Sequence, residues 1–158
     1  MPRRALAVIL AAVVLPWLAV ADAIAGRPMM LDAARVLAEN VLGRGMVKSV
    51  RATPDGAQIM IRWESPTYHP DNGLIANREL MYGEAVLATS AIMGQLPQVL
   101  RIRFTILSGT MMLATGENRR GRGVALMLST DLGGGAYVPP APTLKQPGTP
   151  AGRTAQEI

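Results

Sequence analysis

The segment covering residues 46–65 constrains the fold of this 158-residue chain more than any other. Its centre is the run Thr53-Pro54-Asp55-Gly56, in which proline and glycine occupy positions that suit a tight turn. From Ala57 to Trp63, apolar residues stand at every second position and mostly polar residues stand between them. A period of two is typical of a strand that buries one face. The segment therefore predicts a β-hairpin.

Two stretches show helical periodicity instead. Residues 29–42 carry apolar side chains three and four apart, with Pro28 at the start and Gly43 at the end. Proline suits the first turn of a helix, and glycine commonly follows the last. Residues 74–95 show the same spacing and stop before Pro97. We expect one helix before the hairpin and one after it.

A second hairpin is predicted after the second helix. Residues 100–108 alternate between apolar and polar, and Ser108-Gly109 can turn the chain back into residues 111–116. Residues 124–128 suggest a fifth strand, and we expect Gly133–Gly135 to be a hinge that ends the ordered part. The order is then α-β-β-α-β-β, with a possible further strand. This order predicts an α+β two-layer sandwich whose antiparallel sheet is packed by two helices.

The amino terminus resembles a secretory signal. Arg3 and Arg4 precede the apolar run Ala5–Leu15, Pro16 interrupts it, and Ala23-Ile24-Ala25 has the small-residue pattern of a cleavage site. We predict a signal peptide over residues 1–25 and a periplasmic or secreted bacterial protein. The alternative is an inner-membrane anchor through residues 5–21, which is short for a span of about 20 residues.

The two remaining parts of the mature chain differ in composition. Residues 26–137 are expected to form one α+β domain, which is large enough for a core of its own. Residues 138–158 contain five prolines and almost no large apolar residue, so we expect a disordered tail.

Composition excludes several classes of site. The chain has no cysteine and a single histidine, so we expect no metal and no cofactor. Aromatic residues make up 4% of the chain, too few for the stacking platforms that bind sugars or single strands of nucleic acid. We expect no nucleic-acid partner for an exported protein, although the net charge of +5 would allow one.

Arginines on the second hairpin are the leading candidate for a binding surface. If the two strands pair, the connection after the second strand returns to the arginines that begin the first, and five guanidinium groups share one region. Guanidinium groups bind phosphate and carboxylate groups bidentately. A solvated strand face that discourages aggregation is the alternative reading. The five candidates are Arg101, Arg103, Arg119, Arg120 and Arg122.

One loop concentrates side chains capable of acid–base chemistry. His69 could act as a general base oriented by Asp71, with Tyr68 as a donor, and this loop is the basis of a hydrolase alternative. A second alternative is that Glu64, Asp71 and Glu84 converge as paired carboxylates. Neither has a defined catalytic spacing. Prolines that shape a loop and a residue that caps a helix are the alternative reading of the histidine loop, and solvated carboxylates are the alternative reading of the second group.

The sequence therefore favours binding over catalysis. We expect a small, non-catalytic binding or adaptor protein of the bacterial cell envelope, acting on an envelope protein through its sheet or its basic hairpin. The first alternative is a peripheral module that binds anionic lipid or polymer through the arginine patch. The two differ in their response to salt, since purely ionic binding to an exposed patch weakens as ionic strength rises.

Overall fold

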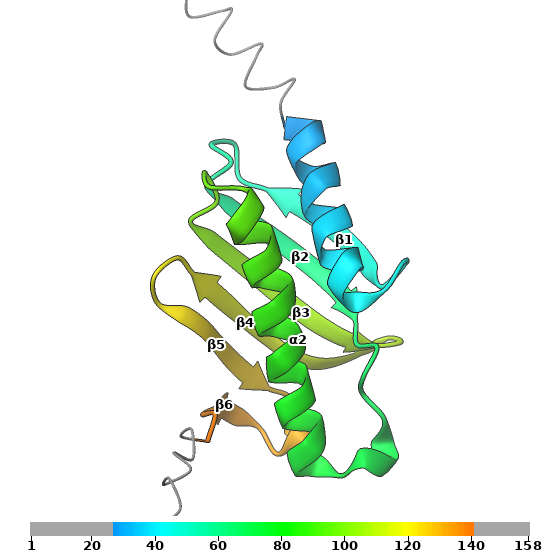
Figure 1. Ribbon diagram of the computed structural model, residues 1–158. Helices are drawn as coiled ribbons and strands as arrows, with labels where there is room; N and C mark the ends of the chain where they lie inside the picture. Colours follow the sequence, from blue (N-terminus) through cyan, green and yellow to red (C-terminus); the bar gives the residue numbers. More distant parts are fainter. Residues whose placement is uncertain (1–26, 141–158) are drawn as a thin grey trace, which may run out of the picture.

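A computed structural model of the chain describes residues 27–140, which form two helices and a six-stranded sheet (Figure 1). The described part of the N-terminal helix covers residues 27–42. Short 3₁₀ turns lie at Pro70–Asn72 and Thr130–Leu132. The other elements are β1 (Val47–Ala52), β2 (Gln58–Glu64), α2 (Leu74–Gln95), β3 (Arg101–Ser108), β4 (Met111–Arg119), β5 (Gly123–Leu128) and β6 (Gly135–Tyr137).

The predicted signal peptide or anchor, residues 1–25, lies outside the described residues, as does most of the predicted tail, residues 141–158. Among residues 27–140, neither helix has the combination of length and apolar character that crossing a bilayer requires.

The α+β class is confirmed, and the sheet is mixed where an antiparallel one was expected. The strands lie in the order β1-β2-β3-β4-β5-β6. Every neighbouring pair is antiparallel except β2 and β3, which run parallel. The reason is α2, because a helical connection can carry the chain back to the end where β2 began. The turn residues of each hairpin predicted that hairpin. The pairing of one hairpin with the other depends instead on the α2 crossover.

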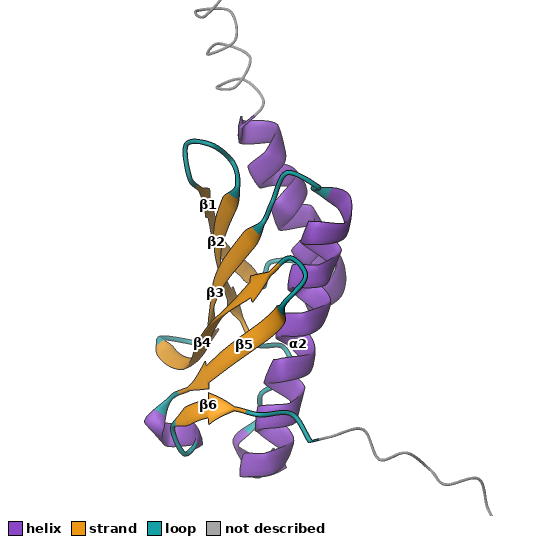
Figure 2. Cartoon of the chain, turned by 90° about the vertical axis from the view of Figure 1, so that its left-hand side faces the viewer, coloured by secondary structure: helices purple, strands orange, loops and turns teal. Residues whose placement is uncertain are grey.

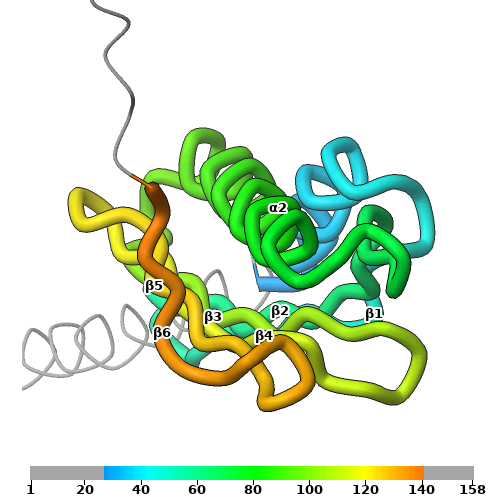
Figure 3. Tube along the Cα trace, turned by 90° about the horizontal axis from the view of Figure 1, so that it is seen from below, coloured from blue at the N-terminus to red at the C-terminus, as the bar shows by residue number. Residues whose placement is uncertain are grey.

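Both helices lie on one face of the sheet, as Figures 2 and 3 show. The side chains that alternate toward the helices, which include Ile59, Ile61 and Trp63 of β2, form the core. The rings of Trp63 and Phe104 pack with centroids 5.3 Å apart. Beneath Phe104 lies Gly116 of β4, where an added Cβ would clash with that ring and with the Ala125 carbonyl oxygen. No described segment covers the other face of the sheet, which we call the outer face.

The chain continues past the three glycines that were expected to end the ordered part. Gly133, Gly134 and Gly135 all have positive φ and turn the chain back to form β6 against β5. An added Cβ at Gly133 would collide with the guanidinium of Arg78, whose Nε donates to the Leu132 carbonyl at 2.8 Å. The glycines therefore reverse the chain close to α2. The glycine run indicated a flexible segment, and the packing on α2 shows that this segment forms a reverse turn into β6.

Candidate functional site

The register of the sheet brings arginines from both hairpins into one row on the outer face. Arg51 of β1 lies opposite Met60 of β2, and Met60 lies opposite Arg103 of β3. The row continues through Glu117 of β4 to Ala125 of β5. Because side chains alternate along a strand, the residues of one such row all point to the same face. The parallel pairing of β2 with β3 therefore joins the two hairpins into one surface.

The next outward-facing row is polar at its centre. Ser49 lies opposite Arg62, and Arg62 lies opposite Thr105. Thr105 in turn lies opposite Thr115, which lies opposite Met127. Across the two rows the cationic side chains are on β1, β2 and β3, and the apolar ones beyond Thr115 are on β5. The outer face thus differs chemically from one side to the other.

Two adjoining depressions lie on this face. The first has a volume of about 300 Å³ and is surrounded by Arg51, Arg62 and Arg103, with Met60 between them. The second measures about 490 Å³ and reaches from Arg103 to Ala125 and Met127. Both are lined by residues 103–105, so they form one trough across the strands. The trough has a cationic end on β1–β3 and an apolar end on β5.

The three arginines at the cationic end have no partner among residues 27–140. Arg51, Arg62 and Arg103 make no ion pair and no side-chain hydrogen bond there, and all three are exposed. Three guanidinium groups around one depression repel one another, and bound anions would relieve that repulsion. Each guanidinium also offers a planar fork of donors that matches a carboxylate or a phosphate.

The other charged side chains of these strands form ion pairs with one another. Glu117 Oε2 accepts a hydrogen bond from Arg101 Nε at 2.8 Å, and Glu117 Oε1 pairs with Arg119 Nε at 2.6 Å. The hydrogen bond from Arg101, aided by Arg119, lowers the pKa of Glu117. Lys48 Nζ lies 2.8 Å from Glu64 Oε2, and this hydrogen bond lowers the pKa of Glu64. In the two outward-facing rows, the cationic side chains without an ion pair among residues 27–140 are therefore Arg51, Arg62 and Arg103.

The five arginines predicted to form one patch separate into distinct environments. Arg101 and Arg119 come together, but they do so around Glu117. Of the five, Arg103 is the one that lines both depressions of the trough. Arg122 is in the turn after β4 and lines a further depression of about 260 Å³ beside Arg119.

Arg120 belongs to the helix side of the sheet. Its Nη2 donates to the Met93 carbonyl at 2.7 Å and to the Val99 carbonyl at 3.0 Å, at the carboxyl end of α2. Because the last carbonyls of a helix lack intrahelical partners, a cation there stabilises the helix end. Arg120 is thus placed to hold α2 in position.

Sequence reasoning missed Arg51 and Arg62. Both occupy polar positions of the first hairpin, so their outward direction was readable. Their proximity to Arg103 was not readable, because it depends on pairing between strands separated by the whole of α2.

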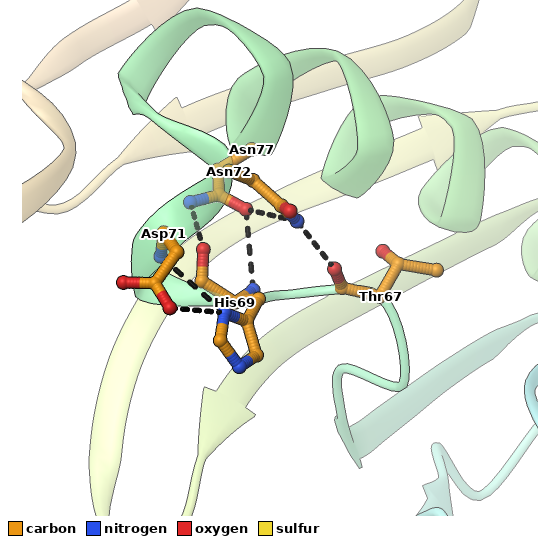
Figure 4. A network of polar contacts seen from close by, with 5 residues as sticks. All are labelled: Thr67, His69, Asp71, Asn72 and Asn77. Carbon is orange, nitrogen blue, oxygen red and sulfur yellow. Dashed lines mark hydrogen bonds and ion pairs between the residues drawn. The ribbon is translucent and has the colours of Figure 1, made fainter.

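The loop that carries the histidine is an exposed helix entrance (Figure 4). The His69 and Asp71 side chains are 64% and 88% exposed, and neither lines the depressions described here. Buried Asn77 organises the loop by donating to the His69 carbonyl at 2.8 Å and accepting from Asn72 Nδ2 at 3.3 Å. Tyr68 is partly buried against the core. These contacts order the start of α2.

The three carboxylates considered as a catalytic group do not meet. Glu64 lies on the outer face with Lys48, and Asp71 lies in the exposed loop. Glu84 of α2 is buried on the opposite face of the sheet, where it accepts hydrogen bonds from Trp63 Nε1 at 3.1 Å and Ser65 Oγ at 2.6 Å. The backbone N–H and hydroxyl of Thr67 also donate to it. Glu84 thereby ties the loop after β2 to α2.

Metal-ligating side chains do not cluster in the part of the chain that the structure describes, where no group of three or more histidine or acidic residues could hold an ion. The outer face, with its trough and with three arginines that have no partner among residues 27–140, is the candidate functional site. Comparisons of the chain with protein-family models, with curated proteins and with solved structures gave no match, so the proposal below rests on the chemistry of this face.

Proposed function

We propose that this chain is an exported, non-catalytic adaptor of the bacterial cell envelope that binds an acidic partner protein on the outer face of its sheet. The observation that carries the proposal is the group of three arginines, Arg51, Arg62 and Arg103, around one depression with no partner among residues 27–140. The export part of the proposal rests on the signal-like residues 1–25.

The chemistry of the trough favours binding over catalysis. Its lining includes one carboxylate, Glu117, which Arg101 and Arg119 hold in its ionised form. A general base must be free to take up a proton, and a carboxylate paired with two cations is poorly suited to that role. The arginines, in contrast, keep their charge at every physiological pH and can hold an anion continuously.

A peripheral module for anionic lipid or polymer is the second candidate. The same three arginines favour it as well, because a sheet face that no segment of residues 27–140 covers can approach a charged surface directly. The two candidates differ in what is retained at high salt: contact with a lipid or polymer surface that is mainly ionic is lost, whereas an interface that also buries apolar area persists.

Charge reversal at one central arginine tests the proposal. Full-length protein with a C-terminal tag would be crosslinked lightly in its source cells, purified from the envelope fraction and analysed by mass spectrometry. Arg103→Glu is the informative variant because Arg103 lines both depressions. Arg44→Glu is the matched control, since Arg44 is exposed in the turn before β1.

The expected result is a stoichiometric protein that co-purifies with the wild-type chain and with Arg44→Glu, and that is lost with Arg103→Glu. Capture that is equal for all three chains would exclude the outer face as the binding surface. Salt-labile retention on membranes with no co-purifying protein would favour the lipid or polymer candidate. The mass of the tagged chain also reports whether residues 1–25 are removed.

A further inference from the structure

We infer that the trough on the outer face accepts a segment of the partner protein that carries an acidic side chain and, about four residues away, an aliphatic one. The inference rests on the proposed function and goes further by naming the chemical pattern that the face recognises. Four features support it: the two unlike ends of the trough, the residue types of the outer face, the hydroxyl groups at the middle of the trough, and its length.

The two ends of the trough would select different side chains. At the cationic end, Arg51, Arg62 and Arg103 converge on one depression and have no partner among residues 27–140. At the opposite end, Met127 is 52% exposed beside Ala125, which is also exposed. An anion fits the first end and an apolar side chain fits the second. A ligand with negative charge alone would leave the methionine exposed.

The residue types of the outer face are those of protein interfaces. Its cationic positions hold five arginines and one lysine, and its apolar positions include two exposed methionines. Arginine and methionine are enriched where proteins bind proteins, and lysine is depleted there. Methionine also adapts its shape to a partner at low cost. These residues are Lys48, Arg51, Arg62, Arg101, Arg103, Arg119, Met60 and Met127.

The middle of the trough can pair with a peptide backbone. Thr105 and Thr115 lie opposite each other, and both are partly exposed. Neither hydroxyl makes a hydrogen bond to any other residue of the segment 27–140. A hydroxyl both donates and accepts, so this pair can bond to the N–H and C=O groups of a segment that crosses the strands.

The length of the trough sets the spacing of the two side chains. Met60 and Ala125 stand in one row and are separated by three strand-to-strand steps. Three steps correspond to about 14 Å. An extended chain covers about 3.3–3.6 Å per residue, so about four residues connect the two ends. The required pattern is therefore local in the partner sequence.

Fluorescence anisotropy with synthetic peptides tests the inference on the full-length chain. The probe is a short labelled peptide in which two glutamates precede a leucine by about four residues. One comparison peptide replaces the leucine by serine, and another replaces both glutamates by glutamine. Vesicles of phosphatidylglycerol and phosphatidylcholine, measured by co-sedimentation, are the lipid probe. The protein variants are Arg103→Glu, Met127→Glu and the control Arg44→Glu.

We expect the leucine peptide to bind about tenfold more tightly than the serine peptide, which corresponds to about 1.4 kcal/mol. Met127→Glu should remove that difference while weak binding of the acidic residues remains. The glutamine peptide should not bind the wild-type chain. Arg103→Glu should abolish binding of both acidic peptides, and Arg44→Glu should leave it unchanged.

Two results would overturn the inference. The first leaves the proposed function intact, and the second rejects it as well. The first result is that the leucine and serine peptides bind equally, or that neither binds, while Arg103→Glu still abolishes capture of the envelope protein. In that case the peptide pattern is wrong and the adaptor proposal stands. If the vesicles bind, the peptides do not, and binding to vesicles requires Arg103, both the peptide pattern and the protein partner are wrong.

Discussion

The two faces of the sheet differ in the burial of their side chains and in the partners of their polar groups. On the inner face, every large side chain of β2 is completely or almost completely buried, and the indole N–H of Trp63 donates to Glu84. On the outer face, neighbouring residues of the same strand are exposed, and three arginines have no partner among residues 27–140. One strand thus contributes buried core side chains and exposed side chains at alternate positions.

The difference separates charge that stabilises the fold from charge that is available for binding. Arg120 and Arg103 both belonged to the predicted patch, yet Arg120 bonds to the end of α2 and Arg103 faces the open trough. A count of basic residues cannot distinguish these roles. Substitutions that compare the two faces can do so, since those on the inner face should change the free energy of unfolding and those on the outer face should change binding.

The largest loss of stability is expected on the inner face. Trp63→Ala removes a fully buried ring that packs on Phe104 and donates to Glu84. We expect the free energy of unfolding, measured by urea titration, to fall by about 3–5 kcal/mol. Met60→Ala, on the outer face of the same strand, should cost less than about 1 kcal/mol. Equal costs would contradict the division between the faces.

A somewhat smaller loss is expected at the buried carboxylate. Glu84→Leu leaves Trp63 Nε1, Ser65 Oγ and the Thr67 donors without their acceptor. Unpaired buried donors are costly, so we expect the variant to lose about 2–3 kcal/mol of unfolding free energy. Hydrogen exchange should also become faster in the loop after β2. Unchanged protection there would show that Glu84 does not tie this loop to α2.

The two arginines give the sharpest comparison. Arg120→Ala should lower the free energy of unfolding by about 1–1.5 kcal/mol, because the carbonyls at the end of α2 lose a charged donor. Arg103→Ala should change it by less than about 0.5 kcal/mol and should weaken partner binding instead. The reverse pattern in the same urea titration would mean that Arg103 stabilises the fold.

The smallest effect is a dependence on pH. The pKa of Glu117 in the folded protein is below its usual value of 4.5, chiefly because Arg101 donates a hydrogen bond to it. Below that usual value the unfolded chain binds a proton more readily than the folded one, so this contribution to stability is lost as the pH falls through the folded pKa. At neutral pH we expect Glu117→Gln to be less stable by under 1 kcal/mol, as is typical of surface ion pairs.

The measurement that checks this is urea unfolding of both chains between neutral pH and about pH 3. The difference between wild type and Glu117→Gln should shrink as the solution becomes acidic. A difference that stays constant would mean that Glu117 is not stabilised by its charge.

Local patterns determined the elements of this protein. The run Thr53–Gly56 with its alternating flanks predicted the first hairpin, and the helix expected over residues 74–95 is present as α2 with the same bounds. These features were readable because strand alternation, helical spacing and turn chemistry each depend on residues within a few positions of one another. The outward direction of Arg51, Arg62 and Arg103 was readable for the same reason.

Only the tertiary structure decided which of those arginines meet. The α2 crossover makes β2 and β3 parallel neighbours, and this one pairing places Arg103 beside Met60 and close to Arg51. The folded chain also places Arg120 at the end of α2 and uses Gly133–Gly135 to reverse toward β6. Contacts between strands joined by a long connection depend on how the helices cover the sheet. No short stretch of sequence contains that information, which is why the trough had to be found in the folded chain.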